Sequence, residues 1–259
     1  MAARLERLDQ PEVAERIFFP RPDPRDPGPP GSIDLTIPVD GGVSLHARFH
    51  PGPSGGPVVL LFHGNGEIVA DYDDFAGPYR ELGASLLPVD YRGYGRSGGS
   101  PTPSSLMRDA DAVLTFVRGW LAERGSPRVV LFGRSLGSAP AIHLAATRGD
   151  EAAALIVESG FALTLPLLRL VGVPVARLGL TEADGFDNRE AMRRVTMPTL
   201  LLHADEDDII PLEDARLNVA ACGAQDKRLV IISGAGHNSI MAYGGRTYWE
   251  AIGELLGRL

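Results

Sequence analysis

Cysteine is almost missing from this sequence of 259 residues, in which Cys222 stands alone. One cysteine cannot form an internal disulfide, so nothing in the chain requires an oxidising compartment, and we expect Cys222 to be a small buried or half-buried apolar residue. Positive charge is also scarce, with 25 Lys and Arg residues against 33 Asp and Glu residues and a net charge of −8. Because nucleic-acid phosphates need a massed basic surface, we expect no nucleic-acid partner.

Long hydrophobic runs are absent as well. The longest apolar stretch, residues 163–176, is interrupted by charged and proline residues and is too short to cross a bilayer. The first 17 residues mix charged with apolar side chains, unlike the continuous apolar segment of a signal peptide. These features predict a cytoplasmic protein without stable membrane insertion.

What remains is the composition of an ordinary globular domain, with 44% hydrophobic and 22% charged residues. The proline-rich stretch 20–31 predicts an extended connector. We therefore expect residues 1–31 to form a short helix and this connector, and residues 32–259 to form one domain.

Within that domain, short apolar stretches alternate with longer amphipathic ones. We expect strands at Ile33–Val39, Ser44–His50, Val58–Phe62, Leu86–Val89, Arg128–Phe132, Ala153–Val157, Thr199–Leu202 and Leu229–Ile232. We expect helices near Asp73–Leu82, Ser105–Glu123, Leu136–Thr147, Leu212–Ala220 and Ile240–Leu256. The alternation predicts an α/β fold with a mostly parallel eight-stranded sheet and helices on both faces. The turn at residues 40–42 predicts that the first two strands are antiparallel.

The strongest local signal is the sequence G-R-S-L-G at residues 133–137, which follows a β-branched strand and opens a helix. This context is typical of a nucleophile elbow, in which the sharp turn exposes the hydroxyl of Ser135. A serine hydroxyl needs a base, and the base needs a carboxylate that orients it. After later strands the chain supplies an acidic loop, with Asp205, Asp207 and Asp208, and then His237. All of these follow the carboxyl ends of strands, so they can meet there, but the three carboxylates are not distinguished by this reasoning.

An acyl-transfer intermediate also needs hydrogen-bond donors for its oxyanion. The backbone N–H of Leu136, at the start of the predicted helix, is one candidate. The sequence H-G-N-G at residues 63–66 follows a buried strand, and its glycines allow the main chain to approach a substrate oxygen. The backbone N–H of Asn65 is our second candidate.

Two weaker patterns resemble a dinucleotide-binding turn and a pair of metal ligands. Neither holds up, so we expect no cofactor and no metal. The sequence G-x-G-x-x-G at residues 93–98 follows a strand, but prolines delay the next helix, whereas a dinucleotide-binding turn opens directly into one. His46 and His50 lie four residues apart on a strand, about 13 Å from each other, which is too far to share a metal ion. We interpret them as surface residues of an edge hairpin.

In the order of these motifs the chain resembles the α/β-hydrolase superfamily from about residue 33 to the C-terminus. The resemblance rests on residues 63–66, 90–97, 133–137 and 234–237. It implies that Asp207 is the acid, because Asp207 stands four residues after His203 and shortly before I-I-P; Asp205 is the next candidate. The sequences of these motifs are most similar to those of a branch with little or no cap domain, which includes depalmitoylating thioesterases. Unlike those enzymes, the chain has no cysteine cluster near its N-terminus.

The resemblance and the residues together predict a serine hydrolase that cleaves a carboxylic ester or thioester of a small acyl substrate. Ser135 would be the nucleophile, His237 the base and Asp207 the orienting acid. An amidase or peptidase with the same triad, or a non-catalytic binding protein of this fold, is the alternative. We expect the apolar segment 161–186 to form a short lid over an acyl pocket, or else an ordinary buried helix. The oligomeric state does not follow from the sequence.

Overall fold

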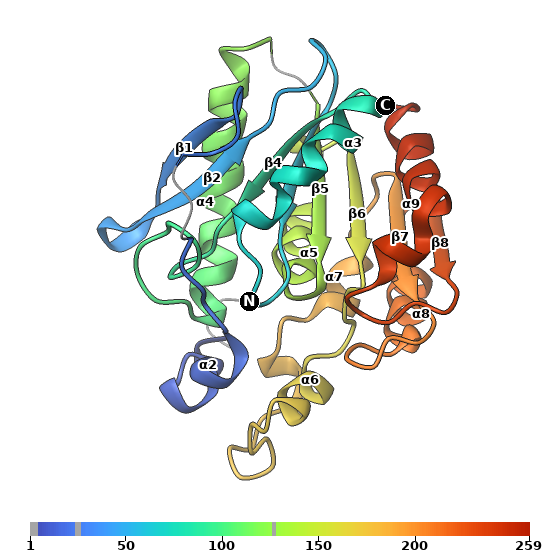
Figure 1. Ribbon diagram of the computed structural model, residues 1–259. Helices are drawn as coiled ribbons and strands as arrows, with labels where there is room; N and C mark the ends of the chain where they lie inside the picture. The colour runs from blue at the N-terminus through green and yellow to red at the C-terminus, as the bar shows by residue number, and fades with distance from the viewer. Residues whose placement is uncertain (1–4, 24–26, 126–127) are drawn as a thin grey trace.

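The computed structural model describes residues 5–23, 27–125 and 128–259. Its centre is one eight-stranded sheet in the order β1-β2-β4-β3-β5-β6-β7-β8 (Figure 1). The strands are β1 (Ile33–Pro38), β2 (Ser44–Phe49), β3 (Val58–Phe62), β4 (Ser85–Val89), β5 (Val129–Arg134), β6 (Ala154–Glu158), β7 (Thr199–Ala204) and β8 (Lys227–Ile232). β1 and β2 form an antiparallel hairpin, β2 is antiparallel to β4, and the remaining neighbours are parallel. The predicted fold class and the antiparallel start are confirmed.

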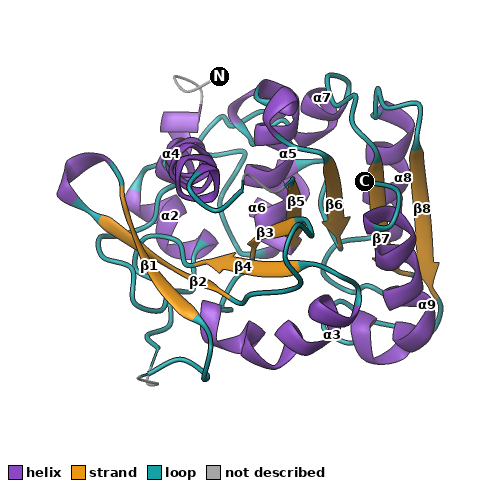
Figure 2. Ribbon diagram, turned by 90° about the horizontal axis from the view of Figure 1, so that it is seen from above, coloured by secondary structure: helices purple, strands orange, loops and turns teal. Residues whose placement is uncertain are grey.

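Helices cover both faces of the sheet, as Figure 2 shows from above. One face carries α3 (Ala76–Glu81) and α9 (Ile240–Leu256), whose buried side chains join one hydrophobic cluster. The other carries α4 (Pro103–Ala122), α5 (Ser138–Thr147), α7 (Asn188–Met192) and α8 (Leu212–Ala221), which belong to a second cluster. Because both faces are covered, every residue of β3, β4 and β6 is buried, which explains their mainly apolar sequences.

Two 3-10 turns replace parts of the expected helices. The turn Val69–Phe75 precedes α3, and the turn Ser135–Gly137 takes the place of the first residues predicted for α5. Others lie at Glu6–Leu8, Asp40–Gly42, Gly149–Glu151 and Glu182–Asp184. Among the described residues, no helix is both long and apolar enough to cross a membrane.

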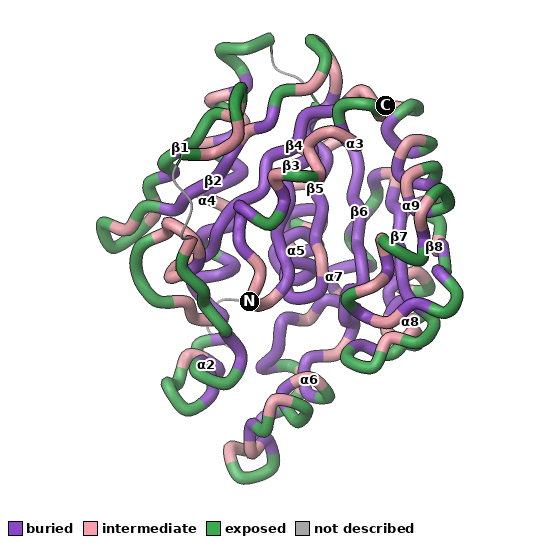
Figure 3. Tube along the Cα trace, viewed as in Figure 1, coloured by how far each residue is buried: buried purple, intermediate pink, exposed green. Residues whose placement is uncertain are grey.

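The N-terminal segment and the segment after β6 both lie beyond the carboxyl ends of the parallel strands. There, α2 (Pro11–Ile17) and α6 (Thr164–Leu170) extend from the sheet (Figure 1). The tube in Figure 3 alternates between buried and exposed along both. Leu8 and Val13 are fully buried in the cluster that also holds α4 and α5. Part of the predicted connector, residues 24–26, lies outside the described residues, and a domain boundary at residue 31 stays a prediction.

The interpretation of His46 and His50 as surface residues is wrong, because both are buried. The reason is a buried ionic network under the hairpin. Arg48, fully buried between them on β2, donates to Asp34 at 2.7 Å and to both oxygens of Asp73 at 2.9 and 3.0 Å. One His46 ring nitrogen lies 3.0 Å from Asp34. No arrangement of His, Cys, Asp or Glu suited to a metal occurs among the described residues.

This network gives a stability prediction. Removing one partner of a buried ion pair leaves the other charge uncompensated, so Arg48→Ala should lower the free energy of unfolding by about 3 kcal/mol. Arg246→Ala is the matched control: Arg246 pairs with Glu250 on an exposed helix face, where a loss below about 1 kcal/mol is expected. Urea denaturation of the three proteins measures both losses. Equal losses would show that the Arg48 network contributes nothing beyond an exposed pair.

Candidate active site

The connection from β5 to α5 is a sharp backbone reversal. A Cβ at Gly137 would overlap the carbonyl oxygen of Phe62 at the end of β3, and a Cβ at Gly133 would overlap the carbonyl oxygen of Gly137. Between these glycines, Ser135 has a φ of 51°, a left-handed backbone conformation that residues other than glycine rarely adopt. The reversal thus presents the Ser135 hydroxyl at the carboxyl edge of the sheet, as the motif predicts.

Three of the predicted site residues form one hydrogen-bonded chain. Nε2 of His237 lies 2.9 Å from the Ser135 hydroxyl oxygen, and Nδ1 lies 2.8 Å from a carboxylate oxygen of Asp207. With its proton on Nδ1, the ring donates to Asp207 and can accept from Ser135. Ser135 and His237 are both buried, so little water competes for these bonds.

The acidic loop after β7 gives its three aspartates different environments. Burial raises the pKa of Asp207, but the bond to His237 and the backbone N–H donors of Ile210 and Ile209 outweigh it, so the net pKa is below its ordinary value. Asp207 is therefore ionised at neutral pH. Asp205 accepts from the backbone N–H of Gly234 at 2.7 Å, and Asp208 is exposed. Of the three, Asp207 alone contacts the imidazole within the described structure.

The two predicted oxyanion donors line the same cavity as Ser135 and His237. Leu136 lies in the 3-10 turn directly after Ser135, where the first N–H groups have no partner within the turn. The loop after β3 brings Asn65 to this cavity. A Cβ at Gly64 would lie 2.6 Å from the guanidinium of Arg134, so a side chain at this position would displace Arg134.

The side chain of Asn65 is held by the N-terminal segment. Its amide nitrogen donates to the carbonyl of Ile17 at 2.6 Å, and its oxygen accepts from the backbone N–H of Phe19 at 3.0 Å and from the Tyr94 hydroxyl at 2.6 Å. These three bonds hold the loop after β3 in place. The Asn65 side chain forms none of them with a backbone N–H group of its own loop. These hydrogen bonds could not be predicted, because no local sequence pattern links residues 17–19 to residue 65.

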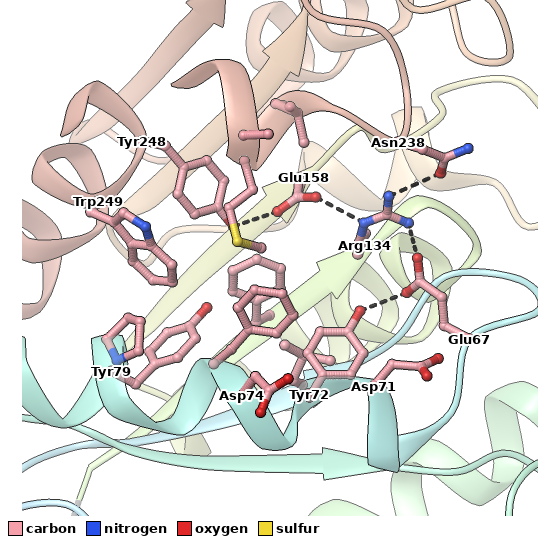
Figure 4. A pocket seen from close by; sticks show the side chains of 17 residues that line it. Glu67, Asp71, Tyr72, Asp74, Tyr79, Arg134, Glu158, Asn238, Tyr248 and Trp249 are labelled. Carbon is pink, nitrogen blue, oxygen red and sulfur yellow. Dashed lines mark hydrogen bonds and ion pairs between the residues drawn. The ribbon is translucent and has the colours of Figure 1, made fainter. Parts of the chain in front are cut away.

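Arg134 joins three loops beneath the site. Its Nε donates to Glu158 at the end of β6 at 2.9 Å, and a second nitrogen pairs with Glu67 after β3 (Figure 4). Its third nitrogen donates to the carbonyl of His237 at 3.3 Å and to the side chain of Asn238 at 3.2 Å. Arg134 is not among the predicted site residues, although it stands directly before Ser135 in the elbow motif.

The chain is similar to several known proteins. A family model described as serine aminopeptidase, S33, matches residues 55–180. An uncharacterized protein of Mycobacterium tuberculosis is 33% identical over 245 residues, which are 93% of this chain and 85% of that protein. Alpha/beta hydrolase domain-containing protein 17B of Homo sapiens is 30% identical over 199 residues, covering 74% of this chain and 64% of that protein. The chain belongs to the α/β-hydrolase superfamily.

A solved structure supports the fold of this α/β-hydrolase. The esterase Pf2001 of Pyrococcus furiosus superimposes with a TM-score of 0.74 over 93% of this chain and 98% of that chain, at 17% sequence identity. At this identity the likeness establishes a shared fold.

The cavity above Ser135 in this α/β-hydrolase has a volume of about 350 Å³. Its apolar walls come from the N-terminal segment, the segment 161–186 and the acidic loop, with side chains such as Phe19, Phe161, Leu167, Leu168, Phe186 and Ile209. Arg134 is the only charged side chain among the described residues that line it, and its charge is directed at Glu67 and Glu158. The cavity thus suits an uncharged, apolar group.

The left-handed conformation of Ser135 can be tested by stability. A residue with a Cβ costs about 1 kcal/mol in that conformation, so Ser135→Gly should be more stable than Ser135→Ala by about 1 kcal/mol. At Thr115, exposed within α4, the order should reverse, because glycine is the poorer helix former by about 1 kcal/mol. Urea denaturation of these four variants checks the prediction, and the same order at both positions would contradict it.

Proposed function

We propose that this protein is a serine hydrolase that cleaves a carboxylic ester or thioester through an acyl-enzyme intermediate. The observation that carries the proposal is the chain of two hydrogen bonds from Ser135 through His237 to Asp207, placed at the floor of an apolar cavity. The three groups are of the kinds that the reaction needs: a hydroxyl, an imidazole within hydrogen-bond distance of it, and a carboxylate whose pKa is below its ordinary value.

In this mechanism the Ser135 hydroxyl oxygen attacks the substrate carbonyl carbon while Nε2 of His237 takes the hydroxyl proton. Asp207 holds the ring in position and stabilises the imidazolium. The negative charge on the carbonyl oxygen is stabilised by the backbone N–H groups of Leu136 and Asn65. The imidazolium then protonates the departing alcohol or thiol. A water molecule, deprotonated by His237, then attacks the acyl carbon. The bond from this carbon to the Ser135 oxygen breaks, the imidazolium returns the proton to that oxygen, and the acid leaves.

The charge of the cavity favours an acyl ester over a peptide substrate. The matching family is described as serine aminopeptidase, and an aminopeptidase must bind the ammonium group of a peptide N-terminus. No carboxylate is among the described residues that line the cavity, so such a cation would have no counter-charge there. The ester reading also agrees with the name of the structurally similar Pyrococcus furiosus protein. A thioester presents the same acyl group and remains within the proposal.

The triad assignment predicts a graded loss of activity towards p-nitrophenyl butyrate. Ser135→Ala should abolish enzymatic hydrolysis of the ester, because the variant has no nucleophile. Asp207→Asn should lower kcat by about 10⁴-fold, because the imidazole loses its orienting anion. Asp205→Asn is the matched control, since Asp205 bonds a loop backbone instead of the ring, and should lose less than about tenfold.

Steady-state kinetics with all variants, checked for folding by circular dichroism, separates the outcomes. Full activity in Ser135→Ala would refute the hydrolase mechanism. The absence of any hydrolysis in the wild-type protein, over esters and thioesters of several lengths, would favour the non-catalytic binding protein.

The segment 161–186 is proposed to act as a lid that forms the acyl pocket. Leu167 on α6 is half-buried and lines the cavity, so Leu167→Trp should shorten the pocket. If the bulk displaces about two methylenes of an acyl chain, the ratio of kcat/KM for octanoate to that for acetate should fall about tenfold. Ile33→Trp, at an exposed position on β1 away from the cavity, is the control. An unchanged ratio in Leu167→Trp would show that acyl groups bind elsewhere.

A further inference from the structure

A second and larger cavity lies on the α3 and α9 side of the sheet, with a volume of about 610 Å³. Figure 4 shows the side chains that surround it. Arg134 and Asn238 line both this cavity and the one that contains Ser135, so the two are neighbours separated by the Arg134 network. The proposed hydrolysis uses nothing else in this second cavity.

Aromatic rings form much of its wall. Tyr79 of α3 stands edge-to-face against Trp249 of α9, with ring centroids 5.4 Å apart, and Tyr248 contacts the same indole at 5.1 Å. Tyr72 and Phe75 form a further pair at 6.0 Å. The face of an aromatic ring is electron-rich and attracts a cation, most strongly at tryptophan.

The charges around the cavity are mostly negative. Glu67 and Glu158 both pair with the single guanidinium of Arg134, so two negative charges face one positive charge there. Asp74, which is exposed and also lines the cavity, has no ion pair with any residue that the structure describes. A cation entering the cavity would therefore meet an excess of negative charge.

The hydroxyl of Tyr79 adds an unused polar group. The side chain is only 2% exposed, and its oxygen points into the cavity (Figure 4). Within residues 5–23, 27–125 and 128–259 it has no hydrogen-bond partner, whereas the Tyr72 and Tyr248 hydroxyls donate to Glu67 and Glu158. Burial raises the pKa of Tyr79 well above its ordinary value, so it stays a neutral hydroxyl whose oxygen can accept a hydrogen bond.

We propose that this cavity is a binding site for an organic ammonium ion with an apolar body. The ammonium group would donate to the Tyr79 oxygen and lie near the face of Trp249, with Asp74 supplying opposite charge at the entrance. The apolar body would pack against Phe75 and Met241. The site is separate from the proposed ester-cleaving centre and does not depend on its activity.

Hexylammonium chloride is the probe, with 1-hexanol as its uncharged counterpart. The chain has two tryptophans, and Trp120 lies on the other side of the sheet, so the two indole N–H signals in a nitrogen-15 spectrum act as reporter and internal reference. At pH 7 we expect hexylammonium to move the Trp249 signal alone, and to bind about tenfold more tightly than hexanol. Equal affinity for hexanol, or an unmoved Trp249 signal, would overturn the proposal.

Variants locate the site by calorimetric titration with the same probe. Tyr79→Phe should weaken binding about fivefold through loss of one hydrogen bond. Trp249→Leu should weaken it about tenfold, whereas Trp120→Leu should leave it unchanged. Ser135→Ala should bind as the wild type does, which separates this site from the proposed hydrolase centre. Unchanged affinity in a folded Tyr79→Phe and a folded Trp249→Leu would place the cation elsewhere and refute the assignment.

Discussion

The candidate site depends on one close approach of backbone to backbone, between the end of β3 and the turn after β5. Gly137 lies so near the Phe62 carbonyl that no side chain fits between them. Because these two chain segments touch, the loop after β3 and the turn around Ser135 share one cavity. The cost is the left-handed backbone of Ser135, which the surrounding sheet must stabilise.

Around this contact, long-range bonds hold the loops that carry the remaining site residues. Arg134 connects the loops after β3 and β8 with the end of β6 through its ion pairs and its bonds to the His237 loop. The N-terminal segment holds Asn65 from the opposite side through the Ile17 and Phe19 backbone. Loops at a sheet edge are mobile unless they are tied down, so these bonds hold the Asn65 and His237 loops in place beside Ser135.

Local sequence patterns were sufficient to predict the strands and the backbone reversal at Ser135. Alternating apolar and amphipathic stretches located all eight strands, and the glycines of the elbow predicted the reversal at Ser135. The fold of the α/β-hydrolase and the meeting of Ser135, His237 and Asp207 followed from strand order and family resemblance.

What the sequence could not predict is set by contacts between distant segments. The position of His46 on a strand does not determine whether its side chain is exposed. His46 is buried because it lies beside the Arg48 ion pairs. The second cavity needs α3 and α9, which are more than 150 residues apart, to place Tyr79 beside Trp249. Short helices such as α6 and α7 lack the length for a clear period, so packing determines them.

The central claim is that the backbone reversal makes Ser135 a nucleophile. The most direct measurement is to treat the folded protein with a fluorophosphonate, digest it, and map the phosphonylated residue by mass spectrometry. The account predicts one adduct, on the peptide that contains Ser135, formed much more slowly when Asp207 is replaced by asparagine. No adduct, or an adduct on another serine with Ser135 unmodified, would contradict it.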